Sequence, residues 1–432
     1  MRAARAAGDE VIVRGNARRS TYAARRALRG RTAPIPVYRI DERGTAHEQG
    51  RLSLTYPDGS VLDLAGPMEW PIRGPEMADG WHDGLPYPLL DMRPQGFLGR
   101  NFARNNAAIL QVDDDPTRWS DDDALHALTL LGDDAPGNFI LGEAAFRLWL
   151  ESVRAPSEPI APSRMFEQYL ELADRALSRG IVGSSAGGEF PKFTAKRRSD
   201  DLDEVSHVIV KFSGNDNSDG TQRWADLLVC EHLAARVVQA GLHLRASEST
   251  IYQVGGRTFL EVVRFDRHGH HGRSGLLSLQ AVNAAFVGAN QAPWPATVLR
   301  LATLALPRPS ALDEATLLWH FGRLVGNTDM HEGNLSFQPA LPDQAGLRLA
   351  PVYDMVPMMY APARGVEVVA RRFDPQLPLP GEAKAWRSAA EAALEFWRLS
   401  SGDARISPGF RAICAENARA VDDALRHPAV AG

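Results

Sequence analysis

The chain has only two cysteines, Cys230 and Cys414, in 432 residues. Two thiols cannot supply a disulfide framework, and neither has a metal-ligand partner near it in the sequence. No stretch approaches the roughly 20 apolar residues that span a bilayer. The N-terminal run MRAARAAGDE is basic, but no apolar core of about 7–15 residues comes after it, as a secretory signal would require. These absences predict a cytoplasmic protein with reduced, buried thiols and no membrane contact.

The composition is that of an ordinary globular protein. Hydrophobic residues make up 44% of the chain and charged residues 23%. A chain of 432 residues is too long for one small core, so we expect two or three domains. No internal repeat is visible.

Charge is unevenly distributed along the chain. Residues 1–31 hold nine arginines against Asp9 and Glu10, a local charge of +7 within a total of −5. Residues 10–14 and 20–24 predict a hairpin with an arginine-rich tip, like the wing of a winged-helix domain whose helices are missing. This basic, wing-like head suggests a nucleic-acid contact, and a solvated basic tail is the equally plausible alternative.

Residues 32–155 are predicted to form a β-rich front domain. Short strands dominate from about 35 to 65, including a hairpin with an Asp58-Gly59 turn. Helices are expected at 121–131, 143–153 and 163–179. The proline-containing stretch 155–162 is the candidate linker between this domain and the rest of the chain.

The remainder divides into a strand-rich part, residues 156–270, and a mostly helical part, residues 271–432. In the first part we expect strands at 181–185, 190–195 and 207–212, a helix at 222–240, and a hairpin that turns at Gly255-Gly256. In the second we expect helices at 276–289, 295–305, 311–325, 382–399 and 408–426. The fold class is therefore α+β.

The most informative run is NTDMHEGN at 327–334, with PVYD at 351–354. An Asp five residues before an Asn, with a second Asp ending a nearby strand, is the pattern that phosphoryl transfer requires. We predict that Asp329 is the base that accepts the proton of the attacking hydroxyl. Asn334 and Asp354 are the predicted ligands of Mg²⁺ beside the nucleotide phosphates.

The same spacing also occurs by chance in ordinary helix-to-strand connections. Three features favour function: His331 within the run, the strand-like NLSF directly after it, and LRLAPVYD about one hairpin later. These segments would form a two-stranded platform that places the base and both metal ligands together. His331 is expected to position this loop at the nucleotide site through a hydrogen bond. A strand-rich half before a helical half with this loop is the bilobal plan of a kinase.

Lys211 ends the apolar strand HVIVK and is predicted to contact the α- and β-phosphates. Such a lysine is held by an acidic residue on the next helix. Glu231 lies in the middle of the apolar face of helix 222–240, where a carboxylate is costly unless it is paired. Asp226 also lies among apolar neighbours, so the choice of partner stays open at this point.

Two further segments complete the predicted nucleotide site. The loop Ser184-Ser185-Ala186-Gly187-Gly188 can bring backbone N–H groups close to phosphate oxygens, because glycine has no Cβ. The segment EVVRFDR at 261–267 joins the strand-rich and helical halves, where a hinge would offer main-chain atoms to adenine. Val263 and Phe265 are the predicted hinge contacts, and a plain strand end is the alternative.

The motifs SSAGGEFPKF, HVIVKF, VRFDR, NTDMHEGN and PVYD together resemble the HipA-like serine/threonine kinases. These kinases are the toxins of type II toxin–antitoxin pairs, and the similarity is greatest to the longer YjjJ type. It extends from about residue 35 to 430. The basic head is similar to a remnant of the winged helix that opens YjjJ-type chains, without its recognition helices.

The resemblance implies a bilobal protein-kinase-like fold that uses ATP and Mg²⁺. It gives Asp329 the role of base, Asn334 and Asp354 that of metal ligands, and Lys211 that of nucleotide contact. Family members phosphorylate serine or threonine of proteins, in known cases aminoacyl-tRNA synthetases, and an antitoxin is their expected partner. They also autophosphorylate a serine of the Gly-rich loop, where this chain has Ser184 and Ser185. The added charge of about −1.5 to −2 would repel the nucleotide phosphates.

Two other functions fit part of the pattern. Small-molecule phosphotransferases of the aminoglycoside type also use D-x-H-x-x-N, but their substrate clefts are usually acidic and they lack a front domain such as residues 35–150. A DNA-associated regulator that keeps the kinase fold only for binding would explain the arginine-rich head.

Overall fold

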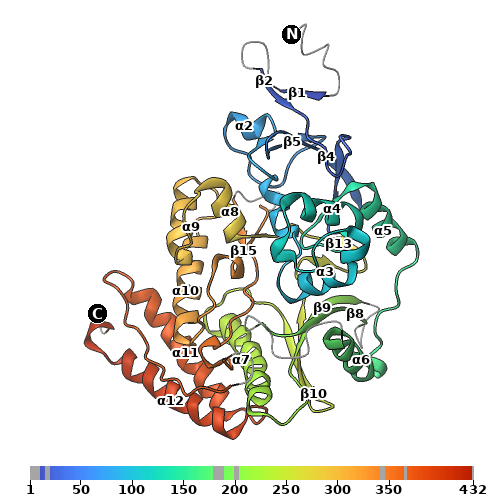
Figure 1. Cartoon of the computed structure of the whole chain (residues 1–432). Coiled ribbons are helices and arrows are strands. Elements are labelled where there is room, and N and C mark those ends of the chain that lie inside the picture. Colours follow the sequence, from blue (N-terminus) through green and yellow to red (C-terminus); the bar gives the residue numbers. More distant parts are fainter. Residues whose placement is uncertain are drawn as a thin grey trace. The chain divides into compact units, whose positions relative to one another are not determined.

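The computed structural model describes residues 10–14, 20–178, 189–198, 204–340, 346–363 and 367–430. These residues form two compact units, each with strands and helices. The first unit comprises the described residues up to Ser157, with Asp266–Leu277 and a short piece after Gln338. The second comprises the remaining described residues and contains every predicted site residue that the structure describes. Figure 1 shows the chain coloured along its sequence.

The first unit is built on a five-stranded antiparallel sheet with the order β6-β5-β4-β3-β7. The predicted Asp58-Gly59 hairpin is confirmed, since β4 and β5 pair with Leu52 opposite Leu62. Ile40 and Ile140 of the sheet pack against Trp149 of α5 in one buried cluster. The strands are β3 (Ile35–Ile40), β4 (Ala46–Leu54), β5 (Ser60–Leu64), β6 (Trp81–His82) and β7 (Phe139–Leu141).

The α-helices described in the first unit all come after β5 in the chain. Ser120 begins α4 as its N-cap and forms a reciprocal capping box with Asp123, which satisfies two free backbone N–H groups. The predicted helices at 121–131 and 143–153 are confirmed within a residue. The structure has α2 (Gly74–Ala78), α3 (Gly96–Leu110), α4 (Asp121–Leu131) and α5 (Gly142–Arg154), and the 3₁₀ helices η3 (Tyr87–Met92) and η4 (Pro116–Arg118). The short strands β12 (Arg267–His268) and β13 (Gly272–Arg273) pair in the same unit.

The predicted basic hairpin is present as strands β1 (Val11–Arg14) and β2 (Thr21–Ala24). Its tip, residues 15–19, lies outside the described residues. Arg14 pairs with Asp63 at 2.8 Å, and Arg26 and Arg29 pair with two consecutive carboxylates at the start of α4. Part of the positive charge of the head is therefore neutralised within the first unit.

The first half of the second unit contains a four-stranded antiparallel sheet of order β10-β11-β9-β8. Successive side chains of a strand point to opposite faces. Val208, Val210 and Phe212 pack in one cluster with Tyr169 of α6, so Lys211 lies on the other face. The elements are η5 (Pro162–Arg164), α6 (Met165–Ser178), β8 (Lys192–Arg198), β9 (Val205–Phe212), α7 (Asp219–Gly241), β10 (Ser249–Val254) and β11 (Arg257–Val263). The strand predicted at 190–195 begins two residues later, and the one at 181–185 lies outside the described residues.

The second half of this unit is mostly helical, as predicted. All five predicted helices are present. The two predicted strands of the platform pair as β15 and β16, with Phe337 opposite Leu349, and β14 adds a third strand to their sheet. The elements are β14 (Leu277–Ser278), α8 (Leu279–Phe286), α9 (Trp294–Thr303), α10 (Ala311–Leu324), η6 (Glu332–Asn334), β15 (Ser336–Gln338), β16 (Arg348–Leu349), η7 (Met358–Tyr360), α11 (Ala383–Gly402), α12 (Pro408–Leu425) and η8 (Pro428–Val430). No helix within the described residues is long and apolar enough to cross a membrane.

Candidate active site

Lys211 is the centre of a buried ionic cluster. Its Nζ lies 2.6 Å from Oε1 of Glu231 on α7 and forms a second ion pair with Oδ1 of Asp354. The lysine and the glutamate are each about 6% exposed. Burial disfavours the lysine charge, but attraction to Asp354 and Glu231 outweighs it and raises the pKa of Lys211. The cluster therefore keeps a fixed cation between two carboxylates from different elements.

The structure also shows which of the two candidate residues on α7 is the partner of Lys211. Asp226 accepts hydrogen bonds from the main-chain N–H of Ser407 (2.7 Å) and from its hydroxyl (2.6 Å). Ser407 is the N-cap of α12, so Asp226 fixes the start of that helix. Glu231, further along α7, is the residue that holds Lys211.

The two carboxylates of the ionic cluster respond differently to their surroundings. Burial raises the pKa of Glu231 despite the lowering effect of Lys211. Burial also opposes the charge of Asp354, but Lys211 and then Lys192 outweigh it and lower the pKa of Asp354. Asp354, with a side chain 35% exposed, is thus the ionised and accessible carboxylate of the cluster.

Asp354 also has an uncommon backbone conformation, with φ of +57°. Non-glycine residues in this left-handed region are infrequent and persist where neighbouring groups hold them. Nδ2 of Asn327 donates to the carbonyl oxygen of Asp354 at 3.1 Å. This bond, together with the ion pair to Lys211, holds the aspartate in place.

The predicted catalytic loop, residues 327–334, comes after α10 and presents Asp329 to solvent. The side chain of Asp329 is 56% exposed. Nδ2 of Asn334 donates to the main-chain oxygen of Asp329 at 2.8 Å. The spacing of five residues thus closes the loop on itself, and it brings the predicted base and a predicted metal ligand together.

His331 has a local structural contact within this loop. Its Nδ1 accepts a hydrogen bond from the N–H of Gly333 (3.1 Å), at the start of η6. Its Nε2 lies 3.8 Å from Oδ1 of Asp329. These contacts agree with a residue that positions the loop beside the base.

Magnesium fits the donor set of Asn334 and Asp354. The Nδ2 group of Asn334 is used by Asp329, and its Oδ1 has no hydrogen-bond partner among the described residues. Oxygen ligands suit Mg²⁺, which usually takes one or two protein carboxylates together with substrate phosphates. No group of three or more His, Cys, Asp or Glu that could hold a metal occurs within the described ranges. A site shared with nucleotide phosphates is the kind that these residues can form.

The remaining predicted nucleotide contacts are placed only in part. Ser184, Ser185, Ala186, Gly187 and Gly188 lie outside the described residues. Lys192 is the cross-strand neighbour of Lys211 and pairs with Glu189 at 2.8 Å. A second lysine therefore lies on the strand that comes after the Gly-rich loop.

The predicted hinge lies at the end of β11. The N–H of Val263 donates to the carbonyl oxygen of Glu248 (2.9 Å), so a contact of Val263 with adenine would have to use other atoms. The ring of Phe265 lies 6.0 Å from that of Tyr353, centroid to centroid. Phe265 is thus close to the segment that leads into Asp354.

Asn327 has a role that its sequence position alone did not reveal, although it opens the motif. Its Oδ1 accepts the N–H of Asp329 at 2.9 Å, while its Nδ2 donates to the oxygen of Asp354. One buried side chain therefore links the loop of the predicted base to the loop of the predicted metal ligand. An Asn two residues before a loop residue is a typical side-chain-to-backbone turn, and this spacing was the available signal.

Two other supporting residues were missed because their partners are distant in sequence. Glu332 is buried and accepts hydrogen bonds from Asn283 (2.8 Å) and Thr297 (2.6 Å). The hydroxyl of Tyr353 donates to the oxygen of Gly333 at 3.0 Å. Both residues hold the predicted catalytic loop in place through contacts with other parts of the chain.

Replacing Asn327 by Ala is expected to lower kcat of phosphotransfer by about tenfold or more, with a smaller change in KM for ATP. The change leaves the N–H of Asp329 and the C=O of Asp354, both in part-buried hydrogen bonds, without their partner, and it loosens the two loops that hold the predicted base and the predicted metal ligand. Steady-state kinetics measure kcat and KM, and thermal unfolding shows whether the variant stays folded. Thr303→Ala, at an exposed position of α9 outside the site, is the control. Equal kcat in the two variants would contradict the positioning role.

Known protein families match the chain on both sides of residue 155. A family model described as the HipA-like C-terminal domain matches residues 184–425, and one described as the YjjJ-like toxin, middle domain, matches residues 31–150. The chain is 38% identical over 409 residues to Toxin YjjJ of Escherichia coli (strain K12), covering 94% of this chain and 88% of that protein. The chain belongs to the HipA-like toxins of the YjjJ type.

Solved structures agree with this family at the level of the fold. HipA of Shewanella oneidensis MR-1, solved in a complex with HipB and operator DNA, superposes with a TM-score of 0.52 at 15% identity. The match covers 91% of this chain and 97% of that one. The Helicobacter pylori proinflammatory kinase CtkA matches 54% of this chain and 92% of that one, at 12% identity, and its TM-score of 0.37 supports no inference. The chain thus has the α+β, HipA-like fold expected from its sequence.

Proposed function

We propose that this HipA-like toxin is an ATP-dependent serine/threonine protein kinase. The observation that carries the proposal is the linked set of Lys211, Glu231, Asp354 and Asp329, in which Asn327 bonds to the loops of both aspartates. This set offers a cation for phosphates, oxygen ligands for a metal, and an exposed carboxylate for a hydroxyl. Those are the groups that phosphoryl transfer uses.

The proposed reaction assigns one role to each of these residues. The hydroxyl oxygen of a serine or threonine bonds to the γ-phosphorus of ATP, while the bond from that phosphorus to the β-γ bridging oxygen breaks and ADP leaves. Asp329 orients the hydroxyl and accepts its proton. Lys211, held by Glu231, contacts the α- and β-phosphates. Asn334 and Asp354 would hold Mg²⁺, which when bound neutralises charge on the β- and γ-phosphate oxygens.

The Gly-rich loop adds a means of self-inactivation to the proposal. Ser184 and Ser185 are its proposed autophosphorylation sites, and Ala186, Gly187 and Gly188 complete its phosphate-binding backbone. A phosphate there would bring about −1.5 to −2 charge to the position of the nucleotide phosphates. Val263, Phe265 and His331 are the proposed further contacts of the nucleotide.

The biological setting is proposed from the family. Phosphorylation of a cytoplasmic protein, with aminoacyl-tRNA synthetases as the favoured class, would arrest growth, and an antitoxin protein would oppose it. The DNA-regulator alternative rests on the basic head. Its support is weakened because Arg14, Arg26 and Arg29 are already paired with carboxylates.

Phosphoproteomics after brief induction tests the proposal in cells. Wild-type protein is expected to stop growth and to add phosphate to serine or threonine of a small set of proteins. Asp329→Ala is expected to do neither while accumulating to the same level. Growth arrest by both proteins, with identical phosphoproteomes, would contradict the kinase.

A further inference from the structure

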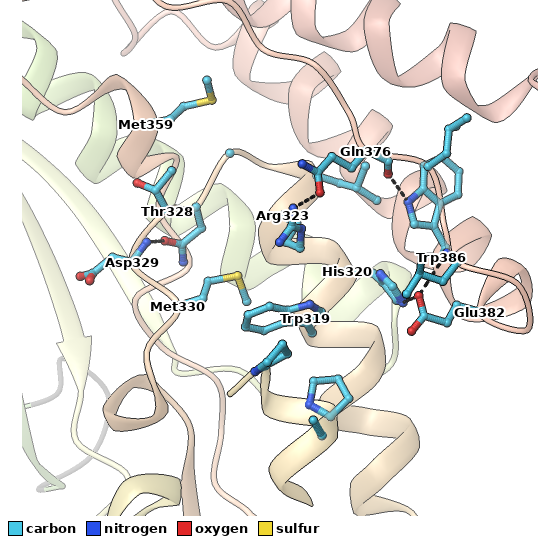
Figure 2. A pocket seen from close by; sticks show the side chains of 18 of the residues that line it. Trp319, His320, Arg323, Thr328, Asp329, Met330, Met359, Gln376, Glu382 and Trp386 are labelled. Carbon is cyan, nitrogen blue, oxygen red and sulfur yellow. Dashed lines mark hydrogen bonds and ion pairs between the residues drawn. The ribbon is translucent and has the colours of Figure 1, made fainter. Parts of the chain in front are cut away.

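A pocket of about 1060 Å³ lies beside the catalytic loop within the second unit. Thr328, Asp329 and Met330 of that loop line it, together with Trp319 of α10. Figure 2 shows Asp329 at one margin of the pocket and Trp386 at the opposite margin, with the carboxylate of Asp329 pointing away from Trp319. A hydroxyl at Asp329 would therefore sit at the entrance, and its neighbours in the substrate would enter the pocket.

The outer wall of this pocket is the proline-rich segment 372–382, which has no regular secondary structure. Nε1 of Trp386 donates to the main-chain oxygen of Gln376 at 2.9 Å, and Arg323 of α10 donates to the side-chain oxygen of the same residue. The N–H of Leu379 donates to Glu382, whose carboxylate lies 3.8 Å from His320. Side chains of α10 and α11 thus hold the wall in place, so the pocket is a built feature of the fold.

Large apolar side chains gather around the pocket although they are open to solvent. Leu299 is 52% exposed, Leu377 is 38% exposed and Leu379 is 68% exposed, and all three line it. Exposed apolar side chains that cluster at a concave surface mark a binding site. Exposure of these apolar side chains to water costs free energy, and an apolar group of a partner that covered them would reduce this cost.

The charges of the lining have mixed signs. Arg323 and Arg372 lie there with Asp329, Asp374 and Glu382. A polycationic small molecule would call for a lining that is acidic throughout, but two arginines and two histidines stand among these three carboxylates. Its volume is also at or above the upper end of the roughly 300–1,000 Å³ of small-ligand sites. A stretch of polypeptide with apolar side chains matches both the volume of the pocket and its mixed apolar and polar lining.

We infer that this pocket binds the residues that flank the phosphorylated serine or threonine of a protein substrate, and that it selects a large apolar side chain among them. The inference rests on the proposed function, because Asp329 determines where the acceptor hydroxyl lies. Leu299 and Leu379 contact that apolar side chain. The substrate is thus a segment with leucine, isoleucine, methionine or phenylalanine close to the acceptor.

A peptide mixture from a dephosphorylated bacterial proteome tests this with the full-length chain, ATP and Mg²⁺. Phosphorylated sites from the wild-type chain are expected to be enriched in large apolar residues at one or more fixed positions beside the acceptor. Leu379→Asp should abolish that enrichment and raise KM for an apolar peptide about tenfold or more, as expected when one leucine contact is lost. It should leave kcat within about twofold, and it should favour peptides with lysine or arginine at the same position.

Leu399→Asp is the matched control, since Leu399 is 40% exposed on α11 and does not line the pocket. Phosphorylation by the wild-type chain without positional preference would overturn the inference and leave the kinase intact. The inference would also be overturned if Leu379→Asp and Leu399→Asp had the same positional preference and the same KM for the apolar peptide. Absence of phosphate on every peptide and protein would instead overturn the proposed function, and this inference with it.

Discussion

Asp329→Asn is expected to slow phosphate transfer from ATP to protein by about 10²–10⁴-fold, the contribution of a well-placed general base. The amide keeps the shape of the side chain but cannot accept the proton of the attacking hydroxyl. Because the Asp329 side chain is 56% exposed, the free energy of unfolding should change by no more than about 0.5 kcal/mol. Initial rates with γ-³³P-labelled ATP and a denaturant unfolding curve measure the two quantities.

Asp313→Asn is the control for this experiment. Asp313 is an exposed carboxylate in the first turn of α10, in the same unit and outside the site. Its loss should leave the rate nearly unchanged. A rate for Asp329→Asn within tenfold of that of the control would show that another group takes the proton.

Lys211→Met is expected to impair both phosphotransfer and stability. Loss of the cation removes the proposed, preorganised contact to phosphate oxygens, an effect on the rate on the order of 10²-fold or more. It also leaves the buried carboxylate of Glu231 without its partner, and breaking a buried ion pair in this way costs about 3–5 kcal/mol. Steady-state kinetics and urea unfolding of the same preparation separate the two effects.

A double variant tests whether the loss of stability comes from the unpaired carboxylate. In Lys211→Met/Glu231→Gln the unpaired charge is gone, so stability should recover in part while activity stays low. Lys384→Met, at an exposed position of α11, should change neither. If the single and double variants are equally stable, the buried pair is not the strong interaction that its geometry indicates. If Lys211→Met keeps full activity, Lys211 does not contact the nucleotide.

The closed geometry of the loop at residues 327–334 was predictable because it is local. Asp329 and Asn334 are five residues apart and bond to each other through side chain and main chain. After its first residue, a histidine, the run HVIVKF is apolar except for its lysine, so β9 and the position of Lys211 could be predicted from the sequence. The choice between Glu231 and Asp226 could not be made, because it depends on the contact of Asp226 with Ser407, 181 positions away.

Helix α3 was missed for a physical reason. Its run GFLGRNFARNNAAIL contains two glycines and several asparagines, which have low helix propensity. Tertiary packing overrides this preference, since Ala103 and Leu110 are fully buried and a Cβ at Gly99 would lie 2.5 Å from the backbone of Pro94. Close approach of Pro94 explains why glycine stands at that position.

The motif RFDR illustrates a role that no local pattern could give. Asp266 and Arg267 fold back into the first unit, where Arg267 is buried and pairs with Asp134 at 2.9 Å and with Asp266 at 2.7 Å. Asp266 also accepts the N–H of Gly137 at 3.1 Å. Composition along the chain cannot show such a return, because Asp266 and Gly137 are 129 residues apart.

Transfer of label from γ-³³P-ATP to proteins of a whole lysate tests the central claim most directly. With wild-type chain and Mg²⁺ we expect labelled protein bands, with the phosphate on serine or threonine, and no label with Asp354→Asn. Label confined to small molecules would instead indicate a small-molecule phosphotransferase. Unchanged protein labelling by Asp354→Asn would contradict the site as described.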